Sequence, residues 1–537
     1  MTIYKLHYRQ APGCVLRVIL IAGLLAVAGL AAAASPQVLG ENPEHRLLRP
    51  PIEPPSPPNR GTYRVKAVYM VPSNRSIQPG AERMLQSYIV RMQAWFREEM
   101  ARLGYGPKSF IYETESSILI PRINLVRVEQ PDTAFQGPYQ ERWNKILAAV
   151  AAAGFTLWNP RELVLIVSET QIQNPDGSFL YGTEDSTFFG GSAAEFSGIG
   201  LVTGETLARF NETFLTDDQP YAGRIIPAIG PFPLVQSISF PAFEETTLSS
   251  TSSSAMGGAL HELGHGLGLW HDFRNDTNFN GNLMGNGFRG SRGILFPKTY
   301  PNDDMRLSSG SALQLNYNRF FNNGKSFTDN TPPQVAIQAQ NQAVIVNGQC
   351  GIEFSAVDTE SSLAGALLIK DGHVVADEPL SGNPVTARLA TYDYRPGEIS
   401  EWLIEAFDTQ GNRGRSTAVS LACPEGANRA PHPFVAVSKR QLRVREKVTL
   451  SAMSSLDPDG DASQMAVEWD LNGDGKFDTP PSSIKTFTKA YRKPGVYRIV
   501  ARLTDEQGDA ATSIPIGIRV GKVKTGTGIN ALKTKGR

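Results

Sequence analysis

An excess of charge of either sign is absent from this chain, in which 52 Lys and Arg residues balance 52 Asp and Glu residues. A neutral protein lacks the basic surface that attracts nucleic acid or an anionic membrane, so we expect neither partner. At 537 residues the chain is also too long for a single hydrophobic core. We therefore expect about three or four domains.

The N-terminus has the pattern of a secretory signal, although its apolar run, residues 18–30, is short for a membrane span. Lys5 and Arg9 give the segment a positive start, and residues 32–34 are small, as a cleavage site requires. An uncleaved membrane anchor is the alternative, and the short run favours cleavage. A signal peptide over residues 1–34 predicts a secreted, periplasmic or cell-surface protein with no stable membrane insertion after cleavage.

Cysteine is scarce, with three residues in the whole chain. Cys14 precedes the apolar run and would leave with the signal peptide. Cys350 and Cys423 remain, and an even pair in an exported protein predicts one disulfide between them.

Histidine is nearly as rare, yet three of the seven histidines fall within residues 261–271, in the pattern H-E-x-x-H-x-x-G-x-x-H. On a helix, His261 and His265 are four residues apart and project from one face. Glycine at position 268 can end the helix in a left-handed conformation, so that the chain turns and brings His271 back. Three imidazoles leave the fourth position of a tetrahedral Zn²⁺ open, and Glu262 is placed as a general base.

This motif resembles the signature of the metzincin clan of zinc endopeptidases, in which a methionine-containing turn follows the histidines. Residues 282–287, Asn-Leu-Met-Gly-Asn-Gly, supply such a turn, and the resemblance implies that Met284 lies under the zinc site. An ordinary core or loop methionine is the alternative. The chain departs from some clan members at Asn286, where they have a tyrosine. It also lacks a cysteine ahead of the motif that could hold the zinc inactive, as happens in matrixins.

The resemblance implies a metzincin-like catalytic domain of α/β (α+β) class, which we place at residues 61–325. Residues 63–71 alternate as a strand, and residues 81–103 repeat apolar side chains at helical spacing. Residues 163–167 form a continuous apolar run, which is typical of a buried central strand. The Gly- and Ser-rich residues 190–203 predict either an edge strand, with which an extended peptide can pair, or a plain loop.

Between the third histidine and the methionine, polar side chains occupy every second position at Asp276, Asn278 and Asn280. Gly281 and Asn282 follow them. Oxygen ligands in this spacing can wrap a Ca²⁺ ion. A polar turn explains the same residues and is the favoured alternative.

The pattern changes after residue 330 to short alternating strands separated by Gly, Asn and Asp turns, which predicts two all-β sandwiches. Residues 331–425 resemble bacterial immunoglobulin-like repeats. Residues 431–521 resemble a PKD domain, a module common beside secreted bacterial hydrolases. Residues 35–60 are Pro-rich and predict a linker or short pro-segment, and the basic residues 522–537 predict a disordered tail.

A second loop with calcium-like spacing lies in the PKD-like segment. Asp470, Asn472 and Asp474 have the D-x-N-x-D-G start of a calcium loop, and Asp478 follows, but the distal Glu of such loops is missing. Calcium binding and a solvated turn are equally compatible with this sequence.

These features predict a secreted zinc-dependent endopeptidase whose partner is a protein or peptide substrate. The β-sandwiches could add a surface or matrix polymer as a second partner. The alternative is a cell-surface adhesive or glycan-binding protein with a structural or vestigial zinc site. Glu262 argues against that alternative, because a purely structural site has no use for a base beside an open metal.

Overall fold

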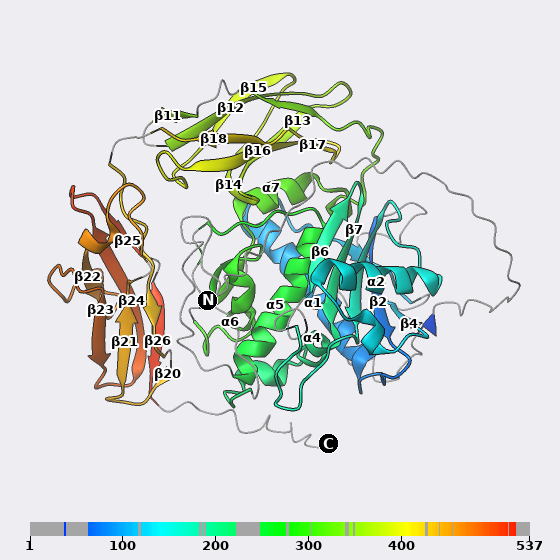
Figure 1. The fold of residues 1–537 in the computed structure, drawn as a ribbon, viewed down its shortest axis with the longest axis horizontal. Helices are drawn as coiled ribbons and strands as arrows, with labels where there is room; N and C mark the ends of the chain where they lie inside the picture. The colour runs from blue at the N-terminus through cyan, green and yellow to red at the C-terminus, as the bar shows by residue number, and fades with distance from the viewer. Residues whose placement is uncertain are drawn as a thin grey trace, which may run out of the picture.

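The computed structural model describes residues 37–38, 63–115, 120–181, 185, 189–221, 247–274, 276, 279–301, 303–338, 343–346, 349–424, 428–439, 441–453, 455–513 and 515–521. The predicted signal peptide and basic tail lie outside these residues, as does most of the predicted Pro-rich segment. The chain is a multidomain protein in which an α/β region is followed by β-sandwiches (Figure 1). Among the described residues, no helix is long and apolar enough to cross a membrane.

The α/β region is built on one sheet with the strand order β1-β4-β2-β5-β7-β6, to which β3 adds beside β2. Neighbours among β4, β2, β5 and β7 are parallel, whereas β6 runs antiparallel to β7 at the edge. The strands are β1 (Gln37–Val38), β2 (Arg64–Val71), β3 (Ile111–Tyr112), β4 (Ile123–Arg127), β5 (Glu162–Ser168), β6 (Gly190–Ala194) and β7 (Ser197–Thr203).

Helices cover both faces of this sheet. Alternate β2 residues Val65, Ala67 and Tyr69 pack in one core with helices α1 (Ala81–Arg102) and α5 (Leu248–Gly266). Val68 and Met70 point the other way, into a second core with α2 (Tyr139–Ala152). A sheet buried on both faces explains why β5 is a continuous apolar run rather than an alternating one.

Shorter elements complete the region around α5. They are η2 (Asp132–Phe135), α4 (Gly204–Ala208), η3 (Glu212–Thr216), β8 (Asn280–Asn282), η4 (Asn286–Gly290), α6 (Ser291–Leu295), β9 (Asp304–Arg306), α7 (Ser309–Tyr317) and η5 (Arg319–Phe321). β8 and β9 pair in parallel. The turn that contains Met284 follows β8 directly.

The first sandwich has two sheets. One contains β10 (Gln334–Ile337), β11 (Val344–Val346), β12 (Gln349–Val357) and β15 (Val385–Thr391). The other contains β13 (Leu363–Lys370), β14 (His373–Pro379), β16 (Ile399–Asp408), β17 (Arg413–Arg415) and β18 (Val419–Ala422). Phe354 and Trp402 are fully buried between them. The predicted disulfide is confirmed: Cys350 on β12 bonds Cys423, with 5.9 Å between the Cα atoms, and so ties the two sheets together.

The second sandwich has its own hydrophobic core. Trp469 is buried in this core together with residues such as Val448 and Ile518. Its first sheet contains β19 (Ala436–Val437), β21 (Lys447–Ser451) and β23 (Thr486–Ala490). Its second contains β20 (Gln441–Leu442), β22 (Ala466–Asp470), β24 (Gly495–Thr504), β25 (Ala510–Thr512) and β26 (Ile516–Val520). The short η6 (Ala462–Gln464) precedes β22.

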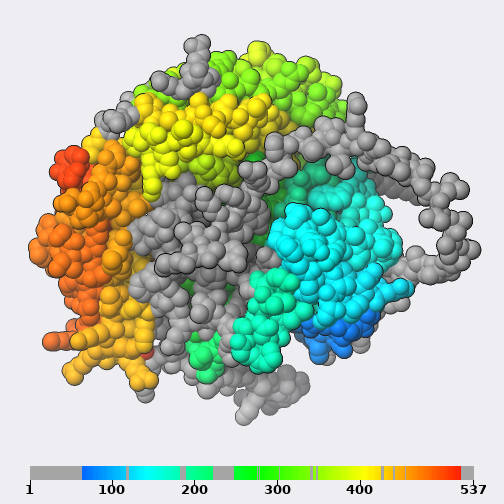
Figure 2. Space-filling view, in the orientation of Figure 1, coloured from blue at the N-terminus to red at the C-terminus, as the bar shows by residue number. Residues whose placement is uncertain are grey.

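The first sandwich packs directly on the α/β region. It forms the green to yellow surface at the top of the molecule in Figure 2. A separate apolar cluster forms this interface: Trp270 and Leu313 of the α/β region meet Leu367, Val374 and Phe407 of the sandwich. The sandwich is therefore attached by a buried core and not only by a linker.

Strands and helices expected from periodicity occur within one residue of their expected limits. The 63–71 strand is β2, the 81–103 helix is α1 and the 163–167 strand is β5. Of the two readings of residues 190–203, the edge strand is the one observed, as β6.

Candidate metal centre

Helix α5 begins at a capping box, in which the Thr247 side chain accepts from the Ser250 N–H and the Ser250 hydroxyl accepts from the Thr247 N–H. The helix is buried along nearly its whole length. It approaches the sheet closely because a Cβ at Gly191, Gly198 or Gly200 would overlap its backbone. The Gly-rich strands therefore let the helix lie on the sheet at backbone contact distance.

The helix ends at Gly266 with Leu267 as its cap, and Gly268, the next residue, has φ of 88°. The Gly268 N–H donates to the His265 carbonyl at 2.9 Å, and the Leu269 N–H donates to the Gly264 carbonyl at 3.0 Å. This pair of bonds is a Schellman motif, in which the left-handed residue reverses the chain. The reversal carries His271 back toward the helix.

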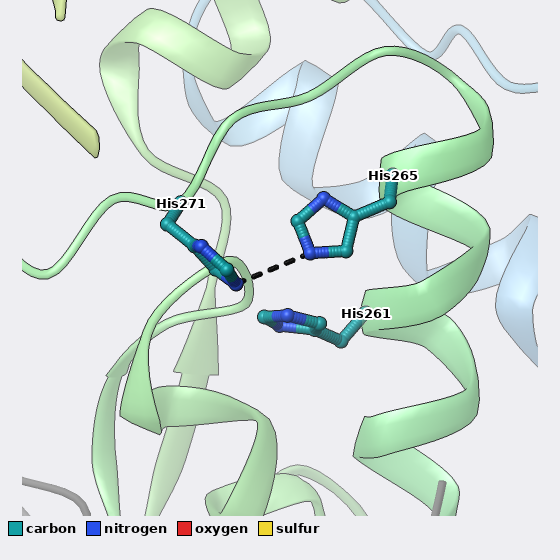
Figure 3. A group of neighbouring side chains, drawn as sticks. All are labelled: His261, His265 and His271. Atoms are coloured by element: carbon teal, nitrogen blue, oxygen red, sulfur yellow. Dashed lines mark hydrogen bonds between the residues drawn. The ribbon is translucent and has the colours of Figure 1, made fainter. Parts of the chain in front are cut away.

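The three histidines point their rings toward one another, His261 and His265 from the helix and His271 from the chain that follows it (Figure 3). One ring nitrogen from each lies within 4.8 Å of the others. The Nε2 atoms of His265 and His271 are 3.2 Å apart. Two nitrogens bound at about 2.0–2.1 Å to a tetrahedral zinc are about 3.3 Å apart, so this donor set fits Zn²⁺.

Hydrogen bonds fix which nitrogen faces the centre. Nδ1 of His261 lies 2.7 Å from the Leu283 carbonyl, and Nδ1 of His265 lies 3.0 Å from the Leu269 carbonyl. Because a carbonyl only accepts, Nδ1 carries the proton in both rings and Nε2 is left with its lone pair. A carbonyl behind each ligand is the usual way in which proteins orient metal-binding imidazoles.

Burial keeps the rings neutral. It lowers the pKa of His261 to about 3 and the pKa of His265 to about 4, and it lowers the pKa of His271 well below its ordinary value. Only the neutral imidazole binds a metal, so all three rings are in the ligating form at neutral pH.

Glu262 lies beside the first ligand and is almost completely buried. Burial raises the pKa of its carboxyl to about 8. No donor within the described part of the chain hydrogen-bonds to this carboxylate. A bound divalent cation would favour its ionised form, and its oxygens remain available for a proton.

Met284 is buried, and its sulfur lies where a side chain at position 264 would be, so Gly264 makes room for it against the helix. The residue before it supplies the carbonyl that holds His261. Its own carbonyl accepts from the Asp272 N–H at 3.0 Å. The methionine turn therefore supports both ends of the histidine motif.

The first sandwich also supports the third histidine, a contribution that the sequence analysis missed. The Val374 N–H donates to the His271 carbonyl at 2.8 Å, and His271 forms a parallel bridge with His373 of β14. Arg274 bridges the two domains, since it pairs with both Asp272 and Asp377 at 2.6 Å. No local motif signals the contacts between the two domains, because their partners lie about a hundred residues apart along the chain.

More sandwich residues fix the turn that carries His271. Arg413 donates to the Gly268 carbonyl at 2.9 Å, and the Trp270 indole donates to Glu405 at 3.1 Å. The guanidinium of Arg415 lies over the Trp270 ring. The turn is therefore held between the helix and the sandwich.

The first of the calcium-like segments uses its oxygens within the protein. The Asp276 carboxylate accepts from the Asn282 N–H at 2.7 Å and the Asn286 N–H at 2.5 Å, and Asn280 accepts from Arg306 at 2.5 Å. Asn278 lies outside the described residues. These bonds make Asp276 the organiser of the methionine turn, and calcium binding there stays a prediction.

The second calcium-like segment behaves in the same way. The Asp470 carboxylate accepts from the N–H groups of Asn472, Gly473 and Gly475, and Asp478 accepts from the Leu471 N–H. The Asp474 carboxylate accepts from Lys476 and Asn472. Within the described residues, Asp470, Asp474 and Asp478 do not converge as a three-ligand cluster. Calcium binding stays a prediction here as well.

Comparison with known proteins identifies one module. Residues 428–520 match the family model of the PKD domain. Comparison with curated protein sequences gives no match. Similar solved structures include wild-type OgpA from Akkermansia muciniphila, at 14% identity and a TM-score of 0.46, with 70% of this chain and 98% of that chain covered. A catalytically inactive OgpA in complex with an O-glycopeptide substrate matches at 13% identity and a TM-score of 0.46, over 70% and 97% of the two chains.

The PKD1 domain of the Vibrio cholerae metalloprotease PrtV matches at 26% identity and a TM-score of 0.14, over 17% of this chain and 99% of that domain. The comparisons thus identify a PKD domain at the C-terminal end of the described chain, and they leave the family of the α/β region to be argued from its site.

Proposed function

We propose that this protein is a zinc-dependent endopeptidase of the metzincin type, with His261, His265 and His271 as metal ligands and Glu262 as general base. The observation that carries the proposal is the convergence of three neutral imidazoles, two of them oriented by backbone carbonyls, beside a buried carboxylate that accepts no hydrogen bond in the described structure. Zinc, when bound, supplies Lewis-acid activation of a water molecule and of the scissile carbonyl.

The chain's own residues perform the proton transfers. The Glu262 carboxylate accepts a proton from the attacking water and then delivers it to the leaving amine. Its burial suits both steps, because a raised pKa lets the carboxyl hold the proton between them. The hydrogen bonds that Nδ1 of His261 and Nδ1 of His265 donate to the carbonyls of Leu283 and Leu269 keep these two imidazoles fixed during the reaction.

A peptide substrate can pair with β6, which is the edge of the sheet nearest the site. Gly191 on this strand lies against the backbone of Glu262 and the side chain of His265. The outer edge of β6 is unpaired within the described sheet, and residues Ala194 and Ser192 are exposed. A strand added there would run past the histidines, which is how an extended substrate would be presented for cleavage.

An adhesive or glycan-binding protein with a structural zinc site explains the centre less well. Structural zinc sites are closed by four protein ligands, whereas the histidine cluster in the described residues holds three. The disulfide between Cys350 and Cys423 and the signal-like N-terminus support a location outside the cytoplasm. The β-sandwiches could there bind a surface polymer in addition to the peptide substrate.

The test compares the Glu262→Gln variant with the parent on a library of plain and O-glycosylated peptides. We expect the variant to keep its zinc and to lose about two to four orders of magnitude in kcat, because only the base is removed. Glu98→Gln, which changes an exposed carboxylate on α1, is the matched control and should keep full activity. Undiminished hydrolysis by Glu262→Gln would refute the assignment.

A further inference from the structure

A second cluster of metal-ligand type lies at the junction between the α/β region and the first sandwich. Asp329 comes from the segment between η5 and β10, Asp358 directly follows β12, and Asp408 is the last residue of β16. One carboxylate oxygen from each lies within 4.8 Å of the others. All three residues are buried, with exposed fractions of 3%, 4% and 0%.

One oxygen of each carboxylate holds its own loop together. Asp329 accepts from the Thr331 N–H at 2.7 Å, and Asp358 accepts from the Ser361 N–H at 2.6 Å. Asp408 accepts from the Asn412 N–H at 2.8 Å through Oδ1, and its Oδ2 accepts from the Ser361 hydroxyl at 2.8 Å and from the Asn412 side-chain amide at 2.6 Å. These bonds explain why the loops adopt their shapes, and they leave one oxygen of Asp329 and one oxygen of Asp358 without a partner in the described structure.

The remaining oxygens are the unusual feature. Oδ2 of Asp329 and Oδ2 of Asp358 are both buried, and neither has a hydrogen-bond partner in the described structure. A buried carboxylate oxygen without a partner is costly, and the structure places two of them in one cluster with a third acid. The pocket therefore needs a further positive group.

Within the described residues, no Lys or Arg forms an ion pair with these three carboxylates. Arg319 lies nearby, but its donors go to neutral oxygens: the carbonyl of Asp329 at 2.5 Å, and Asn412 at 2.8 Å. Burial raises the pKa of Asp408, so a proton shared between carboxyls is the competing way to neutralise the pocket.

We propose that Asp329, Asp358 and Asp408 bind a Ca²⁺ ion that fastens the segment connecting the two domains to the first sandwich. The donors are all oxygens, which suits a hard cation and not zinc. Ligands on opposite sides of calcium are about 4.6–5.2 Å apart, which accommodates the observed spacing. Exposed Glu360, whose carboxylate accepts from the Thr331 hydroxyl at 3.1 Å, lies at the rim and can add a further oxygen.

The position of this site gives it a consequence for the rest of the protein. Asp329 belongs to the connection between the domains, whereas Asp358 and Asp408 belong to the sandwich that holds His271. Calcium would thus link the connecting segment to the sandwich that supports the histidine turn. The calcium site itself does not depend on the proposed peptidase activity.

The experiment titrates CaCl₂ into the full chain carrying Glu262→Gln, which prevents self-cleavage. All samples are first stripped of metal and reloaded with one equivalent of zinc, so that only calcium varies. The parent in this experiment is the Glu262→Gln chain, and Asp358→Asn is added to it. Titration calorimetry should show that the parent binds one more equivalent of calcium than the variant with Asp358→Asn. Glu378→Gln, which changes an exposed carboxylate on β14 outside every calcium-like segment, is the matched control and should keep the equivalent that Asp358→Asn loses.

Thermal unfolding provides the second measurement. When the free calcium concentration is about a hundred times the Kd, the Tm of the first unfolding transition should rise by about 5–10 °C in the parent. This rise should be absent in Asp358→Asn. Trypsin cleavage at exposed Lys325, in the connecting segment, should slow severalfold when calcium is added to the parent and should not change in the variant. If Asp358→Asn does not fold, Asp329→Asn, which lies outside the sandwich, replaces it.

The proposal is overturned if the parent binds no calcium, or if Asp358→Asn and Asp329→Asn bind the same number of ions with the same Tm rise as the parent. A pocket neutralised by a shared proton gives that result. Failure here would leave the zinc assignment intact, because the Glu262→Gln peptide assay reads a different site.

Discussion

His271 and His373 lie side by side in a parallel β-bridge, although one belongs to the histidine motif and the other to the first sandwich. The bridge continues in the bond from the Val374 N–H to the His271 carbonyl. The backbone of a proposed zinc ligand thus extends a sheet of the neighbouring domain. The sandwich acts as part of the scaffold of the proposed metal centre, and not only as an appended module.

The Arg274–Asp377 ion pair should therefore affect the metal centre. Asp377→Asn removes the charge that Arg274 contacts at 2.6 Å across the domain interface. We expect a loss of about 1–3 kcal/mol in stability and a zinc affinity lowered by about tenfold or more, since groups that orient ligands contribute on this scale. Competition with a chromophoric chelator measures the affinity. Glu378→Gln, the exposed neighbour on β14, should behave like the parent; equal zinc affinity in both variants would show that the ion pair does not support the centre.

Gly268 should tolerate no side chain. Its φ of 88° disfavours any other residue, and a Cβ there would overlap the guanidinium of Arg413. Gly268→Ala should cost about 1–3 kcal/mol and reduce bound zinc, because the turn that returns His271 is disturbed. Gly324→Ala is the control, since a Cβ at that position meets nothing within 4 Å. Metal analysis and thermal unfolding check both, and full zinc occupancy in Gly268→Ala would contradict the role of this turn.

The stability of the protein should also depend on pH through Asp393, a residue of the first sandwich whose carboxylate lies 3.9 Å from Nε2 of His373. Burial raises the pKa of this carboxyl to about 7, and burial lowers the pKa of the nearby His373 to about 3, so the two do not form an ion pair near pH 5. A carboxyl whose folded pKa is raised contributes stability at low pH that is lost as the pH rises through about 7. Lys370, Asp371, Arg274 and Arg429 are the other charged groups that act on it.

Asp393→Asn removes this pH dependence. Relative to the parent, the variant should gain on the order of 1–2 kcal/mol between pH 5 and pH 8, after allowance for the 19% exposure of the Asp393 side chain. Thermal unfolding of both proteins at the two pH values measures the difference. A difference in Tm that does not change with pH would show that Asp393 is ionised throughout this range.

Much of the fold and of the centre could be predicted from local patterns. The spacing of His261, His265 and His271 indicated their convergence because helical geometry and one glycine determine it. The continuous apolar run of β5 and the helical spacing in α1 likewise reflect burial within a few neighbouring residues.

The interdomain features could not be predicted in this way. Asp377 and Arg413 are ordinary surface-type residues in sequence, and only the tertiary arrangement places them behind the histidine turn. Asp329, Asp358 and Asp408 are distributed over 80 positions of the sequence. The calcium-like segments at Asp276 and Asp470 are compact in sequence, but their carboxylate oxygens accept hydrogen bonds from backbone N–H groups. The spacing of acidic residues in the sequence therefore predicted metal sites at two turns, and it could not predict the cluster of Asp329, Asp358 and Asp408 that the fold brings together.

The most direct test of the metal centre is the zinc content and coordination of the purified protein, measured by elemental analysis and X-ray absorption. We predict one zinc per chain with three nitrogen ligands at about 2.0–2.1 Å and a further light atom, and loss of that zinc in a variant with His261, His265 and His271 all changed to Ala. A protein that takes up no zinc, or a triple variant that retains it, would contradict the account.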